Sequence, residues 1–282
     1  MKCFYHTDMD GHCAGAIVRK VFGVNGEYIP INYNHLFPFD TIEKDETVVI
    51  VDFSLQKDGD FEKLLEITPN VIWIDHHKTA IERFAYIDGK IKGIRRNGTS
   101  GCELTWEYFF SMTPVPRVVE LLGDYDIWAF RYGDKTNWLQ AGIRLFNTHP
   151  ASDMWNIWLD PSYNPVKEIE YGKISIKYRN NYYVGLVKAF SFCIQFEGYK
   201  TIVCNAGSVS SQLFDSIREE YEIMMTFVFD GKMWNFSLYT KNKDIDVSEI
   251  AKKYGGGGHR QAAGFICDNT KFNQIIHAGH DN

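Results

Sequence analysis

The sequence predicts an α/β protein: an N-terminal parallel-sheet domain with crossover helices, a linker helix, and a smaller C-terminal α/β domain with a mixed sheet. Three apolar runs, at 2–5, 47–51 and 71–74, each end in acids or histidines, and helix-length segments separate them. This alternation is typical of a parallel sheet whose strands are joined by crossover helices. The chain has 282 residues, which is more than one domain usually holds.

The expected domain boundaries follow from a break in the middle of the chain. We expect the first domain to span residues 1–160. Residues 161–195 begin with two prolines in a polar stretch and continue as a charged, partly amphipathic run, so we predict a helical linker there. Residues 196–282 then form the second domain.

The composition is that of an ordinary globular protein, with 45% hydrophobic and 23% charged residues. A formal net charge of −6 disfavours a protein that coats long duplex nucleic acid, because such a protein needs a broad basic face. The six cysteines show no CxxC spacing, no apolar run reaches membrane-spanning length, and the charged N-terminus is unlike a signal peptide. We therefore expect a soluble, cytoplasmic protein that has no membrane partner.

The first predicted strand, 2–5, leads into His6, Asp8 and Asp10, and a helix is expected over 13–22. In an extended segment these three alternating side chains share one face, where they repel each other unless a cation lies between them. The alternative is an acidic turn in which Asp10 is the N-cap of the helix. Both interpretations remain open from this stretch alone.

Two further strand ends carry groups of the same kind. Asp52 follows the run at 47–51, and Asp75, His76 and His77 follow the run at 71–74. In open α/β sheets the ligand site lies at the carboxyl ends of the strands. Imidazole and carboxylate together suit a divalent metal such as manganese or zinc. The alternative is that these residues cap loops or are simply solvated.

The next segment, 95–101, contains two arginines, a glycine turn and two candidate helix caps. Ser100 followed by Glu103 is a capping box for a helix that continues to about residue 110. The functional alternative is phosphate binding at that helix N-terminus. Further on, an apolar helix at 118–122 is followed by Asp124 and Asp126, one of which could complete a metal cluster.

The second domain is expected to contain a hairpin, because Asp230-Gly231 is a strong turn signal between two strand-like runs. The other predicted elements are a strand at 199–204, helices at 208–220 and 246–253, and a strand at 265–267.

A run of four glycines, Gly255 to Gly258, is followed by His259 and Arg260. Consecutive glycines expose backbone N–H groups that can approach a phosphate closely, and the two basic side chains add donors. The alternative is a flexible linker.

Five stretches resemble, in order, the motifs of the DHH family of phosphoesterases: HTDMDG at 6–11, VDFS at 51–54, IDHH at 74–77, GDYDIW at 123–128 and GGGGHRQAAGF at 255–265. The last is the signature of the DHH-associated C-terminal domain of the RecJ/NrnA-like branch. The resemblance implies a DHH catalytic domain at 1–160 and a DHH-associated substrate-binding domain at 196–282.

The resemblance also implies a centre of two manganese ions, with Mg2+ or Co2+ as substitutes. Asp52 would bridge the ions, His77 would face the phosphate, and Asp75 would position a neighbouring histidine. Asp124 is preferred to Asp126 because it follows the apolar run directly. The implied metal ligands are His6, Asp8, Asp10, Asp52, His76 and Asp124, and the implied substrate-binding residues are Gly256, Gly257, Gly258, His259 and Arg260. The histidine of the first motif lies two residues before the first aspartate, a spacing closer to RecJ-like members than to the NrnA pattern.

The activity that the resemblance implies is manganese-dependent hydrolysis of short single-stranded oligonucleotides or linear dinucleotides to nucleoside monophosphates. Three alternatives remain: a hydrolase of cyclic dinucleotides or small nucleotide phosphoesters, a RecJ-like single-strand exonuclease, and a nucleotide-binding regulatory protein without catalysis. The acidic charge disfavours a processive nuclease on long strands. The sequence leaves a homodimer open.

Overall fold

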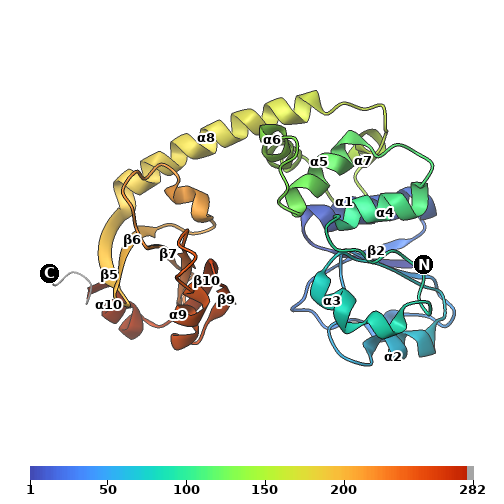
Figure 1. Ribbon diagram of the computed structural model, residues 1–282, viewed down its shortest axis with the longest axis horizontal. Helices are drawn as coiled ribbons and strands as arrows, with labels where there is room; N and C mark the ends of the chain where they lie inside the picture. Colours follow the sequence, from blue (N-terminus) through green and yellow to red (C-terminus); the bar gives the residue numbers. More distant parts are fainter. Residues whose placement is uncertain (278–282) are drawn as a thin grey trace. The chain divides into compact units, whose positions relative to one another are not determined.

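The structure is a computed structural model that describes residues 1–277, and it divides into two compact units, Met1–Ile176 and Lys177–Asn282 (Figure 1). The division lies inside the 25-residue helix α8 (Val166–Phe190), which occupies most of the segment predicted to be a helical linker. The expected boundaries at residues 160 and 195 stay predictions.

The first unit is built on a four-stranded sheet in the order β2-β1-β3-β4, and every pairing in it is parallel. Its strands are β1 (Lys2–His6), β2 (Glu27–Ile31), β3 (Val48–Val51) and β4 (Val71–Ile74). The predicted parallel sheet is confirmed. Strand β2 was not expected, since Pro30 interrupts a short run, but β2 lies at the sheet edge, where proline is tolerated.

Helices cover both faces of this sheet. The helices of the first unit are α1 (Met9–Phe22), η1 (Phe39–Thr41), α2 (Asp60–Ile67), α3 (Lys78–Arg83), η2 (Ala85–Ile87), α4 (Gly101–Phe110), α5 (Arg117–Asp126), α6 (Asp134–Ile143) and α7 (Met154–Trp158). Figure 1 shows α1 and α4 on one side of the sheet and α2 and α3 on the other.

The strands divide their side chains between two cores because successive side chains of a strand point to opposite faces. Cys3 and Tyr5 of β1 pack into the core that contains α1, α4 and α5. Phe4 packs into the second core, together with Phe61 of α2 and Trp73 of β4. Both faces are buried, so the polar residues of this sheet gather where its strands end.

The second unit contains a six-stranded mixed sheet in the order β5-β6-β7-β8-β10-β9, as predicted for this part of the chain. Only the β6–β7 pair is parallel. The predicted hairpin is present as β7 and β8, with Gly231 at φ +97° in the turn. The elements are β5 (Ser191–Phe196), β6 (Tyr199–Asn205), η3 (Ser211–Phe214), β7 (Ile223–Phe229), β8 (Trp234–Tyr239), α9 (Val247–Lys253), β9 (Gly257–His259), β10 (Ala262–Cys267) and α10 (Asn269–His277).

The prediction of a helix at 208–220 is wrong. Only the short 3-10 helix η3 forms there, and Ser208 adopts the left-handed φ of +55°. Three of the first four residues of the segment are serines, whose hydroxyls compete for backbone hydrogen bonds and disfavour a regular helix. Leu213 and Phe214 of η3 nevertheless pack into the core on one face of the second sheet.

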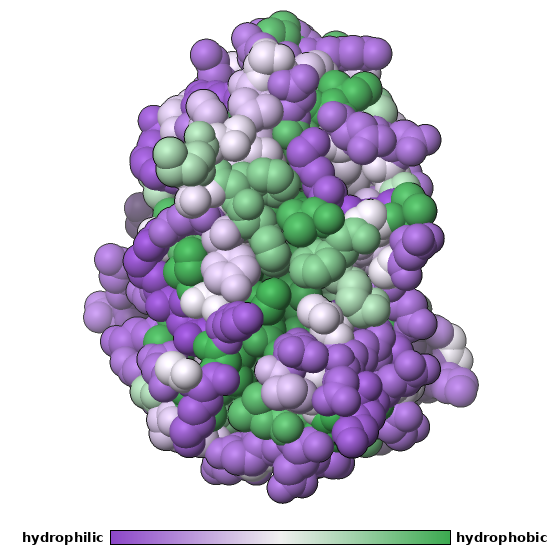
Figure 2. Space-filling view, turned by 90° about the vertical axis from the view of Figure 1, so that its right-hand side faces the viewer, coloured by the Kyte–Doolittle hydropathy of each residue, from purple (hydrophilic) through white to green (hydrophobic). Residues whose placement is uncertain are grey.

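Within residues 1–277 no helix has the length and apolar character that a bilayer crossing would require. Figure 2 shows one face of the molecule, on which apolar residues gather in a central band bordered by hydrophilic ones. Apolar atoms contribute more than half of the surface of ordinary globular proteins, so this band by itself assigns no function.

Candidate metal centre

The candidate site begins where β1 passes into α1. Asp8 is the N-cap of α1, and its Oδ1 accepts a hydrogen bond of 2.9 Å from the backbone N–H of Gly11. The alternative in which Asp10 is the N-cap is therefore wrong, and Asp10 lies in the first helical turn, not in an extended segment. A Cβ at Gly11 would lie 2.1 Å from the carbonyl oxygen of His6, so this tight turn needs glycine.

Asp10 is held by the N-terminus of helix α4. Its two carboxylate oxygens accept hydrogen bonds from the backbone N–H groups of Gly101, at 2.7 Å, and Cys102, at 3.0 Å. The predicted capping box of Ser100 and Glu103 is confirmed at the same helix end. These amides therefore bind a carboxylate of the protein itself, and phosphate binding by them is not needed to explain the segment.

Asp52 lies at the end of β3 in a strained backbone conformation, with φ +53°, and only 1% of it is exposed. Within residues 1–277, neither of its carboxylate oxygens has a hydrogen-bond partner. A Cβ at Gly101 would lie 2.7 Å from the Cβ of Asp52, so the approach of α4 to β3 depends on that glycine.

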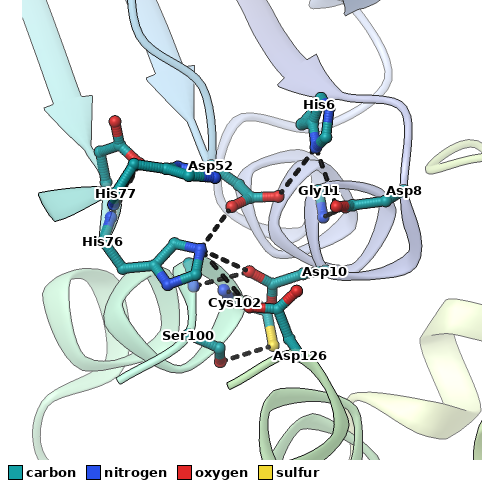
Figure 3. A network of polar contacts seen from close by, with 12 residues as sticks. His6, Asp8, Asp10, Gly11, Asp52, His76, His77, Ser100, Cys102 and Asp126 are labelled. Atoms are coloured by element: carbon teal, nitrogen blue, oxygen red, sulfur yellow. Dashed lines mark hydrogen bonds and ion pairs between the residues drawn. The ribbon is translucent and has the colours of Figure 1, made fainter. Parts of the chain in front are cut away.

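His76 lies among three carboxylates from three different elements (Figure 3). Its Nε2 is 3.1 Å from an oxygen of Asp52, 3.4 Å from Asp126 and 3.9 Å from Asp10. Asp126 is the last residue of α5, and its Oδ2 has no hydrogen-bond partner in the described part of the chain.

A second group of ligand atoms lies on the other side of Asp52. The Nδ1 of His6 is 2.8 Å from Asp8 and 3.7 Å from Asp52. Three sets of residues bring their ligand atoms within 4.8 Å of one another: His6, Asp8 and Asp52; Asp52, His76 and His77; and Asp10, His76 and Asp126. The carboxylate of Asp52 is thus shared between neighbouring sets.

The structure does not bring Asp124, the residue expected to complete the cluster, to the other ligand atoms, and Asp126 lies beside them instead. Asp124 is fully buried, and its oxygens accept hydrogen bonds of 2.5 Å from Thr136 and 2.9 Å from Arg131. Residues two apart on an α-helix point to nearly opposite sides, so Asp124 and Asp126 cannot both face His76. The apolar run that precedes Asp124 shows only that this position is the more buried of the two.

Asp75 makes the contacts that a positioning residue needs. One of its oxygens accepts hydrogen bonds from the backbone N–H of His76, at 2.8 Å, and of His77, at 3.2 Å. The same oxygen lies 2.7 Å from the Nδ1 of His77. These contacts hold the His77 ring by one nitrogen and leave Nε2 for another partner.

Crowding of buried carboxylates shifts their pKa values upwards. Burial, and next the charge of Asp52, raise the pKa of Asp10 to about 8. Burial, and next the charge of Asp10, raise the pKa of Asp126 to about 7, and burial raises the pKa of Asp52 well above its ordinary value. The crowding therefore favours protonated carboxyls, and a bound cation would favour the ionised carboxylates instead.

The pKa values of His6 and His77 are also raised. Burial alone would lower the pKa of His6, but Asp52 and Asp8 raise it to about 10. Burial likewise opposes the effect of Asp75, which raises the pKa of His77 to about 9. Negative charge therefore dominates the electrostatics of the whole site.

The donor set fits divalent metal ions. Carboxylate oxygens suit manganese and magnesium, and imidazole nitrogens suit transition metals. The buried oxygens of Asp52 and Asp126 that accept no hydrogen bond would be satisfied by a cation. The motifs missed Tyr33, whose hydroxyl oxygen is 3.5 Å from both ring nitrogens of His77. No strand end or motif singles out Tyr33, and only the folded loop brings it to the site.

The glycine loop lies in the second unit and is ordered. β9 pairs with β10, and a Cβ at Gly256 would lie 2.1 Å from the carbonyl oxygen of Gly264. The flexible-linker alternative is therefore wrong. Gly258 takes a φ of +145°, a backbone conformation that glycine adopts without strain. His259 and Arg260 are exposed, and Arg260 donates from Nε to the carbonyl oxygen of Lys243 at 3.0 Å.

Residues 202–280 match the family described as the DHHA1 domain. A protein of Acanthamoeba polyphaga mimivirus that is named uncharacterized is 27% identical over 81% of this chain, and the chain spans 55% of that protein. The oligoribonuclease NrnB of Bacillus subtilis is 24% identical, with 93% of this chain and 71% of NrnB covered. The bifunctional oligoribonuclease and PAP phosphatase NrnA of Mycoplasma genitalium is 21% identical, with 95% and 88% covered.

Two solved structures are similar in fold. The pGpG-specific phosphodiesterase PggH from Vibrio cholerae matches with a TM-score of 0.56 at 14% identity, over 98% of this chain and 96% of that one. The exonuclease RecJ bound to manganese matches with a TM-score of 0.52 at 15% identity, over 98% of this chain and 88% of that one.

Proposed function

Because the chain belongs to the DHH phosphoesterases and carries their DHH-associated domain, we propose that it is a metal-dependent phosphodiesterase of short oligonucleotides or linear dinucleotides. Its products would be nucleoside monophosphates. The names of relatives and of a structural neighbour, as oligoribonucleases and as a pGpG phosphodiesterase, support this substrate class.

The observation that carries the proposal is the buried carboxylate cluster around Asp52. The Asp52 carboxylate is 1% exposed and accepts no hydrogen bond within residues 1–277, and the groups nearest to it are the imidazoles of His6 and His76. Ionised carboxylates packed together in this way are unfavourable unless cations lie among them, and a metal ion supplies more positive charge than the two imidazoles can.

In this proposal the cluster would hold two ions. One would be held by His6, Asp8 and Asp52, and the other by Asp10, Asp52, His76 and Asp126. Manganese is the first candidate, in keeping with the manganese-bound RecJ structure, and Mg2+ or Co2+ are the alternatives. When bound, two such ions activate a water molecule and neutralise charge that develops on the phosphoryl group.

The protein's own groups orient the substrate. His77, held at Nδ1 by Asp75, presents Nε2 as a donor for a non-bridging phosphate oxygen. Asp75 acts through His77 and is a positioning residue in this proposal. In the second unit, the backbone of Gly256, Gly257 and Gly258 and the side chains of His259 and Arg260 would bind a phosphate of the substrate.

A second candidate activity is hydrolysis of a small nucleotide phosphoester, because the NrnA relative is named a PAP phosphatase as well as an oligoribonuclease. It would use the same metal ligands. The two activities differ in the group attached to the phosphorus, so a substrate panel separates them.

The test is hydrolysis of dinucleotides, oligomers of rising length, cyclic dinucleotides and 3′-phosphoadenosine nucleotides with Mn2+. We expect dinucleotides and short oligomers to be hydrolysed fastest, and Asp52→Asn to abolish hydrolysis of all of them. Arg260→Ala should slow the dinucleotide most, since a short substrate has few other phosphates to bind. Equal turnover by Asp52→Asn, or long strands cut as fast as dinucleotides, would contradict the proposal.

A further inference from the structure

A pocket of about 340 Å3 lies next to the metal-binding cluster and is formed entirely by the first unit. Its size is within the range of about 300–1,000 Å3 that is usual for small-molecule sites. The residues that line it include Tyr33, Gln56, His77, Thr79, Arg83 and Phe84. His77 also belongs to one of the metal-binding sets, so the pocket opens beside the place where the reacting phosphate would lie.

One wall of the pocket is an aromatic ring that is both fixed and accessible. Tyr33 stacks on Phe53, with ring centroids 5.1 Å apart and an angle of 28° between the planes. It also meets His77 edge-on at 5.9 Å. Yet 39% of Tyr33 remains exposed. A rigid, accessible aromatic ring is the group on which proteins stack a nucleobase.

The lining of the pocket also includes a guanidinium group that is held in place. Arg83 donates from Nε to Asp58 at 2.7 Å and from Nη1 to the carbonyl oxygen of Gln56 at 2.6 Å. These contacts use two of its five N–H donors. The planar guanidinium stacks on aromatic rings and bases, and here it lies 5.2 Å from the ring centre of Phe84.

A second, smaller hollow continues from the first along the same surface. It measures about 220 Å3 and shares Leu55 and Gln56 with the pocket. Phe39 and Lys63 line it, with the Lys63 ammonium 4.1 Å from the ring centre of Phe39. The two hollows thus bring aromatic rings and basic groups together in neighbouring sites, a combination typical of surfaces that bind single-stranded nucleic acid.

We propose that the pocket formed by Tyr33, Gln56 and Arg83 binds the nucleobase of the nucleotide that adjoins the scissile phosphate. The inference rests on the proposed function and adds to it the part of the substrate that the first unit recognises. Tyr33 and Arg83 supply the stacking surfaces, which accept any base, and the amide of Gln56 supplies hydrogen bonds to the base edge.

The test couples changes in the protein to changes in the substrate. The substrates are a linear diadenosine dinucleotide and two analogues, each lacking one of the two bases. For the wild-type protein with Mn2+, removing the base that occupies the pocket should lower kcat/KM about tenfold or more, mainly through KM. Arg83→Ala and Tyr33→Leu should each lower kcat/KM for the intact dinucleotide to a similar degree. For the analogue that lacks the base bound in the pocket, the same substitutions should lower kcat/KM much less.

Arg144→Ala is the matched control, since Arg144 is an exposed arginine that does not line the pocket. It should leave all three substrates unchanged. If Arg83→Ala lowers kcat/KM equally for intact and base-lacking substrates, or for neither, the proposal that this pocket binds a base is refuted. The proposed phosphodiesterase activity is not affected by that result. If the wild-type protein hydrolyses no dinucleotide at all, the proposed function fails and the pocket assignment fails with it.

Discussion

Asp124 and Asp126 show how two identical residues on one helix take different roles. Asp126 lies 3.4 Å from His76 with an oxygen that has no hydrogen-bond partner in the described chain, whereas the carboxylate of Asp124 is bound by Arg131 and Thr136. Asp124 also accepts a hydrogen bond from the backbone N–H of Arg131. Its role is to hold the segment that follows α5.

The first prediction separates these two roles. Asp126→Asn should weaken Mn2+ binding by about tenfold or more, because a charged ligand becomes neutral while the fold keeps its packing. Asp124→Asn should instead lower the free energy of unfolding by about 1–3 kcal/mol, because a buried charge-assisted contact is lost. Calorimetric titration with Mn2+ and urea unfolding measure the two effects. A larger loss of metal affinity in Asp124→Asn would show that the assignment is reversed.

The second prediction concerns pH and the metal-free protein. The carboxyls of Asp10 and Asp126 have pKa values of about 8 and 7 in the folded state, compared with about 4 when unfolded. Between these values the folded state binds more protons, so the free energy of unfolding falls as pH rises. With chelator, the melting temperature should therefore fall from pH 5 to pH 8.

His6 and His77 add to the same trend. Their raised pKa values make a contribution to stability that is complete below about pH 6.5 and is lost as pH rises towards 9 or 10. Saturating Mn2+ should make the melting temperature depend less on pH, because the metal ions replace the protons bound to these groups. A melting temperature that rises with pH in chelator would contradict this account.

At the scale of the element, helix α4 is the support on which the site is built. Its first two amides bind Asp10, its capping box closes the same end, and Gly101 lets the helix approach Asp52. A negatively charged group at a helix N-terminus is stabilised by the helix dipole. One helix end thus lies against two carboxylates from different elements, Asp10 of α1 and Asp52 directly after β3.

The third prediction tests this close approach. In Gly101→Ala, the new methyl group would lie 2.7 Å from the Cβ of Asp52 and 2.9 Å from Oδ2 of Asp10, so α4 or β3 must move. We expect weaker Mn2+ binding and lower activity, even though alanine favours a helix.

Gly185→Ala is the control for this prediction. Gly185 lies in helix α8, and a Cβ there would meet nothing within 4 Å, so the substitution should stabilise the protein by up to about 1 kcal/mol. Its Mn2+ affinity should not change. Equal metal affinity in the two variants would show that the approach of α4 is not needed for the site.

For the whole molecule, the division into two units predicts that metal acts on one of them. Every residue of the three candidate metal-binding sets lies in the unit Met1–Ile176. Ligands stabilise only the state that binds them. The fourth prediction is that Mn2+ slows amide hydrogen exchange in β1, β3 and the start of α4, and leaves β6, β7 and β8 unchanged.

Asp52→Asn is the control for the exchange measurement, and it should show no effect of Mn2+ in either unit. Protection that appears mainly in the second unit would place the metal site elsewhere. Protection in neither unit, at metal concentrations that support hydrolysis, would show that the cluster does not hold the catalytic ions.

Much of the fold could be predicted because its signals are local. The strand at 71–74 coincides with β4, and the capping box of Ser100 and Glu103 and the turn at Asp230-Gly231 are present as expected. These features depend on hydrophobic runs and turn residues a few positions apart. The segment at 208–220 could not be predicted in the same way, because serine–backbone competition outweighed its apolar spacing.

The sequence by itself determined the parallel sheet and the residues at its strand ends. The residues that directly follow a parallel strand lie at the carboxyl edge of the sheet, so their positions can be predicted from the strand alone. Only the tertiary structure decided which groups meet there. Asp126 takes the place expected for Asp124, Gly101 fits against Asp52, and Tyr33 reaches His77 across a gap of 44 residues. The physical reason is that helix rotation and the close approach of separate elements depend on packing across the whole unit, which no short stretch of sequence contains.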